Sequence, residues 1–328
     1  MTKLFNGPSN SITDIDGFLV GNAHDDKLKS GVTVLTRATS FRASVSILGG
    51  APGTKETDLL SPDKIVDNID GLVLSGGSAF GLDASSGVMD CLKNQNRGFD
   101  TGSIKIPIVP SAILFDLKNG GFKDWKINPY RDLGKNAFFN VSEKFEIGSV
   151  GAGCGATTSI VKGGLGTASL FYGDRLKVGA IVTVNSVGSP CFPGTNILYS
   201  DFFGANKEHL EKPPTSSLTN STKLLKGEAT TLAIVCTNLN FNKSDLNRIA
   251  TAAHSGIARA IEPSHTPFDG DIIFSATSGT QPIYSKDKDL MLVCQLSALC
   301  ITQAVGSAIK AARRKRGDKL ACWADLKT

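Results

Sequence analysis

One stretch decides the fold: Gly227-Glu228-Ala229-Thr230-Thr231-Leu232-Ala233-Ile234-Val235-Cys236-Thr237-Asn238. In it, a polar tract ends at two threonines, and an apolar run follows at once. A short apolar run bounded by turn residues is typical of a strand buried on both faces. The pattern therefore predicts a central strand that begins at Thr230, where a flexible segment enters a rigid sheet.

Thr230 stands where a threonine suits the role of a new chain N-terminus after cleavage. The free α-amino group of such a residue has a pKa of about 8, so it can take the hydroxyl proton directly or through one water. β-Branching also limits χ1 and helps to hold Oγ in place. Paired threonines at the start of a strand are equally ordinary β-sheet chemistry, so these residues alone leave both interpretations open.

The composition is that of an ordinary soluble globular protein. The chain has 328 residues with a net charge of +5, and 41% of them are hydrophobic. Length suggests about two domains, although single α/β folds also reach this size. The basic run 313–316 is expected to be the solvated last turn of a helix, where cations suit the dipole. Nucleic-acid binding is not expected, because basic residues interleaved with aromatic ones are lacking.

The cysteines indicate a reducing compartment, and we expect a cytoplasmic protein. There are seven of them, scattered through apolar runs without a C-x-x-C pair, so zinc and thioredoxin-like chemistry lack support and no metal or cofactor is expected. A signal peptide and a membrane span are not expected either, because the N-terminus lacks a basic segment before an apolar core and no run of about 18 apolar residues occurs.

Strands and helices are expected to alternate along the chain. Strands are predicted within 12–20, 31–35, 43–48, 69–74, 178–184 and 272–276, and helices over 82–92, 246–261 and 290–314. The segment 117–135 reads as irregular. The tract 204–228, with its paired prolines and serines, is the clearest linker.

Three glycine-rich segments stand out, and two of them do not match the standard motifs that they resemble. The loop 49–58 is either a plain connector or a backbone cradle for a ligand. Ser75-Gly76-Gly77-Ser78-Ala79-Phe80-Gly81 lacks the spacing of a nucleophile elbow and the Lys of a P-loop, yet its strand–glycine–helix order presents amides to a site. The segment 151–156 is a poor dinucleotide fingerprint, because a β-branched stretch follows it.

Polar residues at two strand ends are candidates for chemistry. Asn185 follows the predicted strand 178–184, where its amide can donate to an oxyanion or simply form a turn. Asp269 and Asp271 flank Gly270 ahead of the strand 272–276, where they can hold an ammonium group or form an Asx turn.

Taken together, these motifs resemble the L-aminopeptidase/D-Ala-esterase/amidase family (DmpA-like). That family includes β-peptidyl aminopeptidases and the nylon-oligomer hydrolase. Two long strings carry most of the resemblance: Gly49-Gly50-Ala51-Pro52-Gly53-Thr54-Lys55-Glu56-Thr57-Asp58-Leu59-Leu60 and His265-Thr266-Pro267-Phe268-Asp269-Gly270-Asp271. Shorter matches in the same order extend it over nearly the whole chain, excluding the linker and both tails.

The resemblance implies a four-layer αββα sandwich of the type shared with ornithine acetyltransferase, formed by residues 1–328 as a single domain. It implies self-cleavage between Ala229 and Thr230 into an α chain, 1–229, and a β chain, 230–328, which stay associated as a homo-oligomer, a tetramer of cleaved pairs. The implied catalytic residues are Thr230, Asn185, Asp269, Asp271 and Lys162. The implied substrate-binding residues are Gly76, Gly77, Ser78 and Phe115.

The resemblance predicts a self-cleaving N-terminal-threonine amidohydrolase that acts on small peptides or amides. One departure matters: the family commonly has Asn or Gly before the nucleophile, and Ala229 stands there in this chain. Two alternatives stay open. One is an acyltransferase on the same fold, and the other is an uncleaved, non-catalytic member.

Overall fold

The computed structural model describes residues 3–203, residue 222 and residues 229–326. The predicted linker 204–228, Thr222 apart, lies outside the described residues. The described residues form the α-helices α1 (Asp83–Asn94), α2 (Tyr130–Phe139), α3 (Lys243–Ala260) and α4 (Lys286–Ala311). The strands are β1 (Leu4–Asn6), β2 (Leu19–Asp25), β3 (Ser30–Ile47), β4 (Thr54–Lys55), β5 (Asn68–Ser75), β6 (Phe99–Asp100), β7 (Lys105–Ile106), β8 (Ser111–Ile113), β9 (Gly164–Tyr172), β10 (Leu176–Asn185), β11 (Thr230–Leu239) and β12 (Ile272–Gln281).

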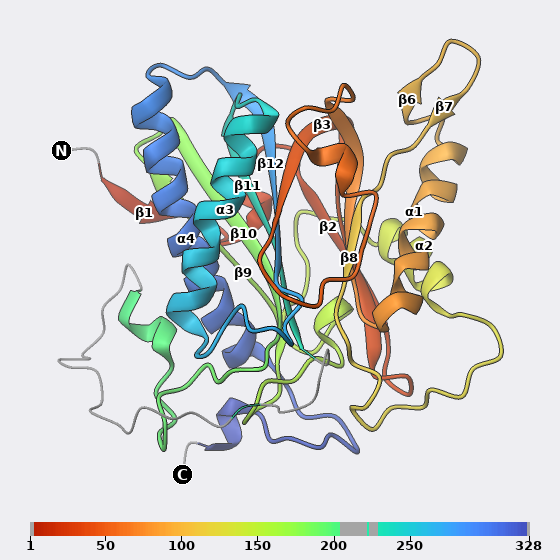
Figure 1. Cartoon of the computed structure of the whole chain (residues 1–328), viewed down its shortest axis with the longest axis vertical. Coiled ribbons are helices and arrows are strands. Elements are labelled where there is room, and N and C mark those ends of the chain that lie inside the picture. The colour runs from red at the N-terminus through yellow and green to blue at the C-terminus, as the bar shows by residue number, and fades with distance from the viewer. Residues whose placement is uncertain (1–2, 204–221, 223–228, 327–328) are drawn as a thin grey trace.

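The elements form four layers, with helices outside and strands inside. The strand order is β1-β9-β10-β11-β12-β3-β5-β8-β4, with β2 paired to β3. The long strand β3 belongs to both inner layers: its C-terminal half pairs with β12 and its N-terminal half with β2 and β5. In Figure 1, α3 and α4 lie on one side of the strands, and α1 and α2 lie on the other. The predicted αββα sandwich is confirmed.

Among the described residues, three hydrophobic cores separate these four layers. One packs α3 and α4 against the strands β9, β10 and β11. Another packs α1 and α2 against β2, β3 and β5. The third lies between the two layers of strands and contains Phe41, Leu72, Ile234 and Phe274, all buried. Because β11 contributes alternate residues to two of these cores, both of its faces are buried, as its continuous apolar run predicts.

Most predicted elements exist, but three expectations were wrong. The segment 12–20 holds a short 3-10 helix (Ile12–Asp14) before β2, because the Ser11 hydroxyl caps that turn. The segment 117–135, expected to be irregular, contains the start of α2, whose apolar face packs on α1. The basic run 313–316 follows α4 instead of forming its last turn.

Helix α4 is long and apolar enough to cross a bilayer. In its most apolar 18-residue window, 67% of the residues are buried inside the protein. It packs in the first core against β9 and β10. Since most of that window is buried inside the protein, the length and apolar composition of α4 suit a core helix.

We predict that Phe274→Ala lowers the free energy of unfolding by about 3–5 kcal/mol, because the substitution leaves a cavity between the two layers of strands. Phe139→Ala is the matched control, since that ring is 72% exposed at the end of α2; its effect should stay within about 0.5 kcal/mol. Denaturant unfolding of both variants measures the difference. Equal losses would contradict a packed core between the strand layers.

Candidate active site

Three neighbouring strands bring their polar ends to one edge of the sheet. Because β11 runs parallel to β12, the residues before both strands lie at the same edge, and Ala229 pairs with Asp269. Because β10 runs antiparallel to β11, its last residue, Asn185, lies directly opposite Thr230. The register of the sheet thus assembles Thr230, Asn185 and the Asp269–Asp271 loop from segments far apart in the sequence.

The hydroxyl of Thr230 lies against the peptide bond that precedes it. Its Oγ1 donates to the Ala229 carbonyl oxygen at 2.6 Å. The same oxygen accepts a hydrogen bond from the Gly270 N–H at 2.9 Å. Residue 270 must be glycine here, since an added Cβ would lie 2.6 Å from Thr230 Oγ1 and 2.8 Å from the Ala51 carbonyl oxygen.

Both carboxylates of the Asp269–Asp271 loop are buried and well supplied with hydrogen-bond donors. Asp269 accepts from the Val187 N–H at 3.1 Å and from the N–H and hydroxyl of Thr266 at 3.0 and 2.7 Å. Asp271 Oδ1 accepts from the Thr231 N–H at 2.7 Å. Burial and the charge of Asp271 raise the pKa of Asp269.

Two histidines beside this loop were missed in the sequence. The His265 ring donates from Nδ1 to Asp271 Oδ2 at 2.8 Å, and its backbone N–H donates to the same oxygen at 3.0 Å. The His254 ring, on α3, packs edge-on against it with centroids 4.9 Å apart. His265 is the first residue of the matched string 265–271, so the sequence pointed to its position. The sequence did not predict its pairing with Asp271.

Two further partners fix the orientation of the Asn185 side chain. Its Oδ1 accepts from the Thr157 N–H, and its Nδ2 donates to the Phe115 carbonyl oxygen, both at 3.0 Å. Phe115, predicted to bind substrate, therefore meets the site through its backbone.

The glycine loop after β3 supports the acidic loop with its backbone. The Leu48 and Gly49 amides donate to the Asp271 carbonyl oxygen, and the Ala51 amide donates to that of Asp269. A Cβ at residue 49 would lie 2.2 Å from the Asp271 nitrogen, so only glycine allows this approach. The sequence left open a plain connector or a cradle for a ligand. These contacts favour a different role, in which the amides of the loop bind the protein's own acidic loop.

The predicted glycine turn after β5, residues 75–81, is linked to the site only indirectly, through the segment that contains Phe115 and Asp116. The Gly77 N–H donates to Asp116 Oδ1 at 2.8 Å, and Asp116 follows Phe115 in the chain. The amides of Gly76 and Ser78 donate to carbonyl oxygens of Gly31 and Leu114. Because all three amides already have acceptors, this turn reaches the site through its link to Phe115.

Lys162 is buried, but its ammonium group points to the C-terminal segment. Its Nζ pairs with Asp318 Oδ2 at 2.5 Å, and Lys29 pairs with Asp318 Oδ1 at 2.7 Å. The hydrogen bonds from both lysines outweigh burial and hold the pKa of Asp318 below its usual range. Lys162 connects to the other predicted residues through Thr157, its bridge partner, which binds Asn185.

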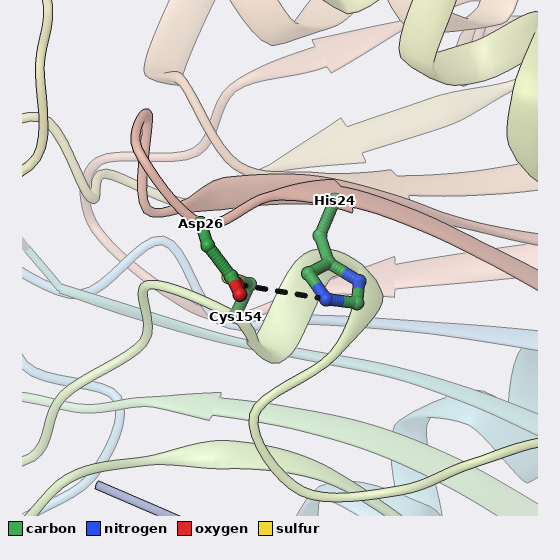
Figure 2. A group of neighbouring side chains, drawn as sticks. All are labelled: His24, Asp26 and Cys154. Atoms are coloured by element: carbon green, nitrogen blue, oxygen red, sulfur yellow. Dashed lines mark hydrogen bonds and ion pairs between the residues drawn. The ribbon is translucent and has the colours of Figure 1, made fainter. Parts of the chain in front are cut away.

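A separate cluster joins His24, Asp26 and Cys154 (Figure 2). Lys315 already pairs with Asp26 there, and its Nζ lies 3.7 Å from Cys154 Sγ. Burial raises the pKa of the Cys154 thiol to about 11, so the sulfur keeps its proton near neutral pH. In this structure the Lys315 ammonium group is the cation that pairs with the Asp26 carboxylate of the cluster.

We predict that Gly270→Ala lowers the free energy of unfolding by about 1–3 kcal/mol. The added Cβ would clash with both the Thr230 hydroxyl and the Ala51 carbonyl oxygen, so each of them must move away. Gly71→Ala is the control: its nearest neighbour is 3.4 Å away, so it should be neutral or slightly stabilising. Denaturant unfolding compares them. A neutral Gly270→Ala would contradict the close approach to Thr230.

Comparison with known proteins identifies the family of this chain. The profile described as peptidase family S58 matches residues 10–321. The chain is 37% identical over 286 residues to an uncharacterized aminopeptidase of Mycobacterium tuberculosis, covering 82% of each chain. It is 28% identical over 284 residues to the 6-aminohexanoate-oligomer endohydrolase of Paenarthrobacter ureafaciens, covering 81% of this chain and 74% of the relative.

Two solved structures share the fold. A β-aminopeptidase of a Burkholderia species superposes with a TM-score of 0.72 at 17% identity, covering 99% of this chain and 94% of that one. The L-aminopeptidase D-Ala-esterase/amidase of Ochrobactrum anthropi, described as a variant of the Ntn hydrolase fold, gives 0.69 at 22% identity, covering 96% and 91%. With its Ntn-type sandwich and the profile match over nearly its whole length, the chain belongs to peptidase family S58 and is an enzyme that hydrolyses amide bonds.

Proposed function

We propose that this hydrolase cleaves its own backbone between Ala229 and Thr230 and then uses Thr230 as an N-terminal nucleophile. Its substrates would be small peptides or amides with a free N-terminus, as its relatives' aminopeptidase names suggest. One observation carries the proposal: the Thr230 hydroxyl lies 2.6 Å from the Ala229 carbonyl oxygen, at the peptide bond that would be cut.

In the first step, Thr230 Oγ1 attacks the Ala229 carbonyl carbon. The C–N bond breaks, the Thr230 nitrogen takes a proton, and an ester joins residues 229 and 230. Charge that develops on the Ala229 oxygen meets the Gly270 N–H, 2.9 Å away. Water then hydrolyses the ester, which leaves a carboxylate on Ala229 and a free amine on Thr230. Ala229 offers the same carbonyl as the Asn or Gly that commonly stands before the nucleophile.

In the mature enzyme, Thr230 Oγ1 attacks the substrate carbonyl and passes its proton to its own amine. The amine protonates the leaving group, and water releases the acyl-enzyme. Asn185, held in a fixed orientation, is the side-chain donor proposed for the oxyanion, with a contribution of about 3 kcal/mol for such a donor. Asp269 and Asp271 orient the Thr230 amine, the substrate amine or both. Lys162 supports Asn185 through Thr157.

Two alternatives make different predictions. An acyltransferase on this fold would pass the acyl group to an added amine, so product analysis with an amine acceptor separates it from a hydrolase. An uncleaved member would stay one intact chain. The Gly270 N–H on the Ala229 carbonyl oxygen favours cleavage, because it supplies the donor that the first step needs.

We predict that denaturing mass analysis of the purified protein shows two fragments, 1–229 and 230–328, and that Thr230→Ala gives one intact chain without amidase activity. The reason is that removing Oγ1 removes the attacking atom. N-terminal sequencing of the smaller fragment should begin Thr-Thr-Leu-Ala.

Two matched variants sharpen this test. Thr231→Val removes the neighbouring hydroxyl and keeps its shape, so cleavage should persist. Thr230→Ser keeps a hydroxyl at the attacking position and should also cleave. A single intact species in the unmodified protein, or cleavage that survives Thr230→Ala, would overturn the proposal.

A further inference from the structure

Both ring nitrogens of His265 face hydrogen-bond acceptors. Nδ1 lies 2.8 Å from the Asp271 carboxylate, and Nε2 lies 3.4 Å from the His254 carbonyl oxygen. A neutral imidazole carries one N–H and must leave its other nitrogen as an acceptor. Because both neighbours only accept, this geometry suits the doubly protonated imidazolium.

The backbone at His265 is shaped to make these contacts. Its φ of +55° lies in the left-handed region, which is strained for a non-glycine residue. This conformation lets the backbone N–H and the ring reach the same oxygen of Asp271. A strained residue that is held this way beside a nucleophile indicates a functional demand on its position.

Without a charge on His265, the titratable groups around it would carry negative charge and no compensating positive charge. The titratable groups that face it, among the described residues, are Asp271 and Asp269 on its own loop and His254 on α3. Burial lowers the pKa of His254 to about 4, so that ring is neutral and adds no charge. Asp269 and Asp271 lie on the loop that pairs with Ala229, so without a cation their negative charge would favour the protonated form of the amine that the proposed cleavage releases on Thr230.

Burial lowers the pKa of His265, but the hydrogen bond and the charge of Asp271 outweigh it and raise the pKa above its usual value. A raised pKa means that the imidazolium is favoured in the folded state. Its stabilising effect is therefore complete below the ordinary histidine pKa of about 6.5 and is lost as the pH rises through the higher folded value.

We propose that His265 is a positioning residue that, as an imidazolium, holds Asp271 in place and offsets its charge. The Thr230 amine can then lose its proton near neutral pH and serve as the base. This inference rests on the proposed function, but the charge state of His265 does not. Asp271 transmits the effect, since its other oxygen binds the Thr231 N–H next to the nucleophile.

The charge state is tested first, in Thr230→Ala protein, which needs no activity. The chain has four histidines, so Cε1 labelling gives four titrating signals, which are assigned by replacing the histidines one at a time. We expect the His265 midpoint above 6.5 and the His254 midpoint near 4. A His265 midpoint below 6.5 would overturn the inference, whatever the fate of the Ala229–Thr230 bond.

The effect on the reaction is tested in the cleaved enzyme with His265→Gln, which keeps a donor for Asp271 but carries no charge. We expect the acidic limb of kcat/KM against pH to move upward by about one pH unit, with about tenfold lower activity below the new midpoint. His24→Gln, in the separate cluster with Lys315, is the control and should leave the profile unchanged. An unchanged profile in His265→Gln would show that the charge of His265 is not used.

Discussion

The site depends on the register of β11 between an antiparallel neighbour and a parallel one. A one-residue slip along β10 would move every side chain of β11 to the other face, and Thr230 would then no longer lie opposite Asn185. The pairing with β12 fixes the other side, where Ala229 lies beside Asp269. Because β11 buries both faces in two different cores, a slip would also expose apolar residues to the wrong layers. Packing of the sandwich thus sets the geometry around Thr230.

Burying two carboxylates at a sheet edge is costly unless each finds donors. Here the surrounding loops supply them. Val187 and Thr266 donate to Asp269, while Thr231 and His265 donate to Asp271. The glycine loop after β3 binds the carbonyl groups of the same segment, so the backbone of the acidic loop is held as firmly as its side chains. A network of this kind is rigid because nearly every polar group in it has one fixed partner.

The sequence predicts well what depends on local pattern. The apolar run after Thr230 is a strand, as expected from residue types alone. Helix α2 was missed, because polar residues precede Tyr130 and its apolar face is short. Roles that depend on register could be assigned only through the family resemblance.

Partners that are distant in sequence were not predictable. Asp318, the partner of Lys162, lies 156 residues away in a segment without a recognisable motif. His265 stands inside a recognised string, but its pairing with Asp271 depends on a left-handed backbone that residue types do not specify. Long-range ion pairs and strained turns follow from tertiary packing, so the sequence pattern gives their residues without their contacts.

The proposed reaction uses one set of donors twice. Before cleavage, the Gly270 N–H and the Thr230 hydroxyl both contact the carbonyl group of Ala229, which stands where a substrate carbonyl would later be attacked. Cleavage frees that place and adds an amine at the same edge, next to two carboxylates. An amine there is useful as a base only if the local negative charge is small, because an uncompensated acidic pair would keep it protonated. As the proposed imidazolium, His265 would supply one compensating charge, with its Nδ1 2.8 Å from the Asp271 carboxylate. In the proposed reaction, amine binding and proton transfer therefore place opposite demands on the same loop, which must be acidic enough to bind amines and neutral enough to leave the Thr230 amine free as a proton acceptor.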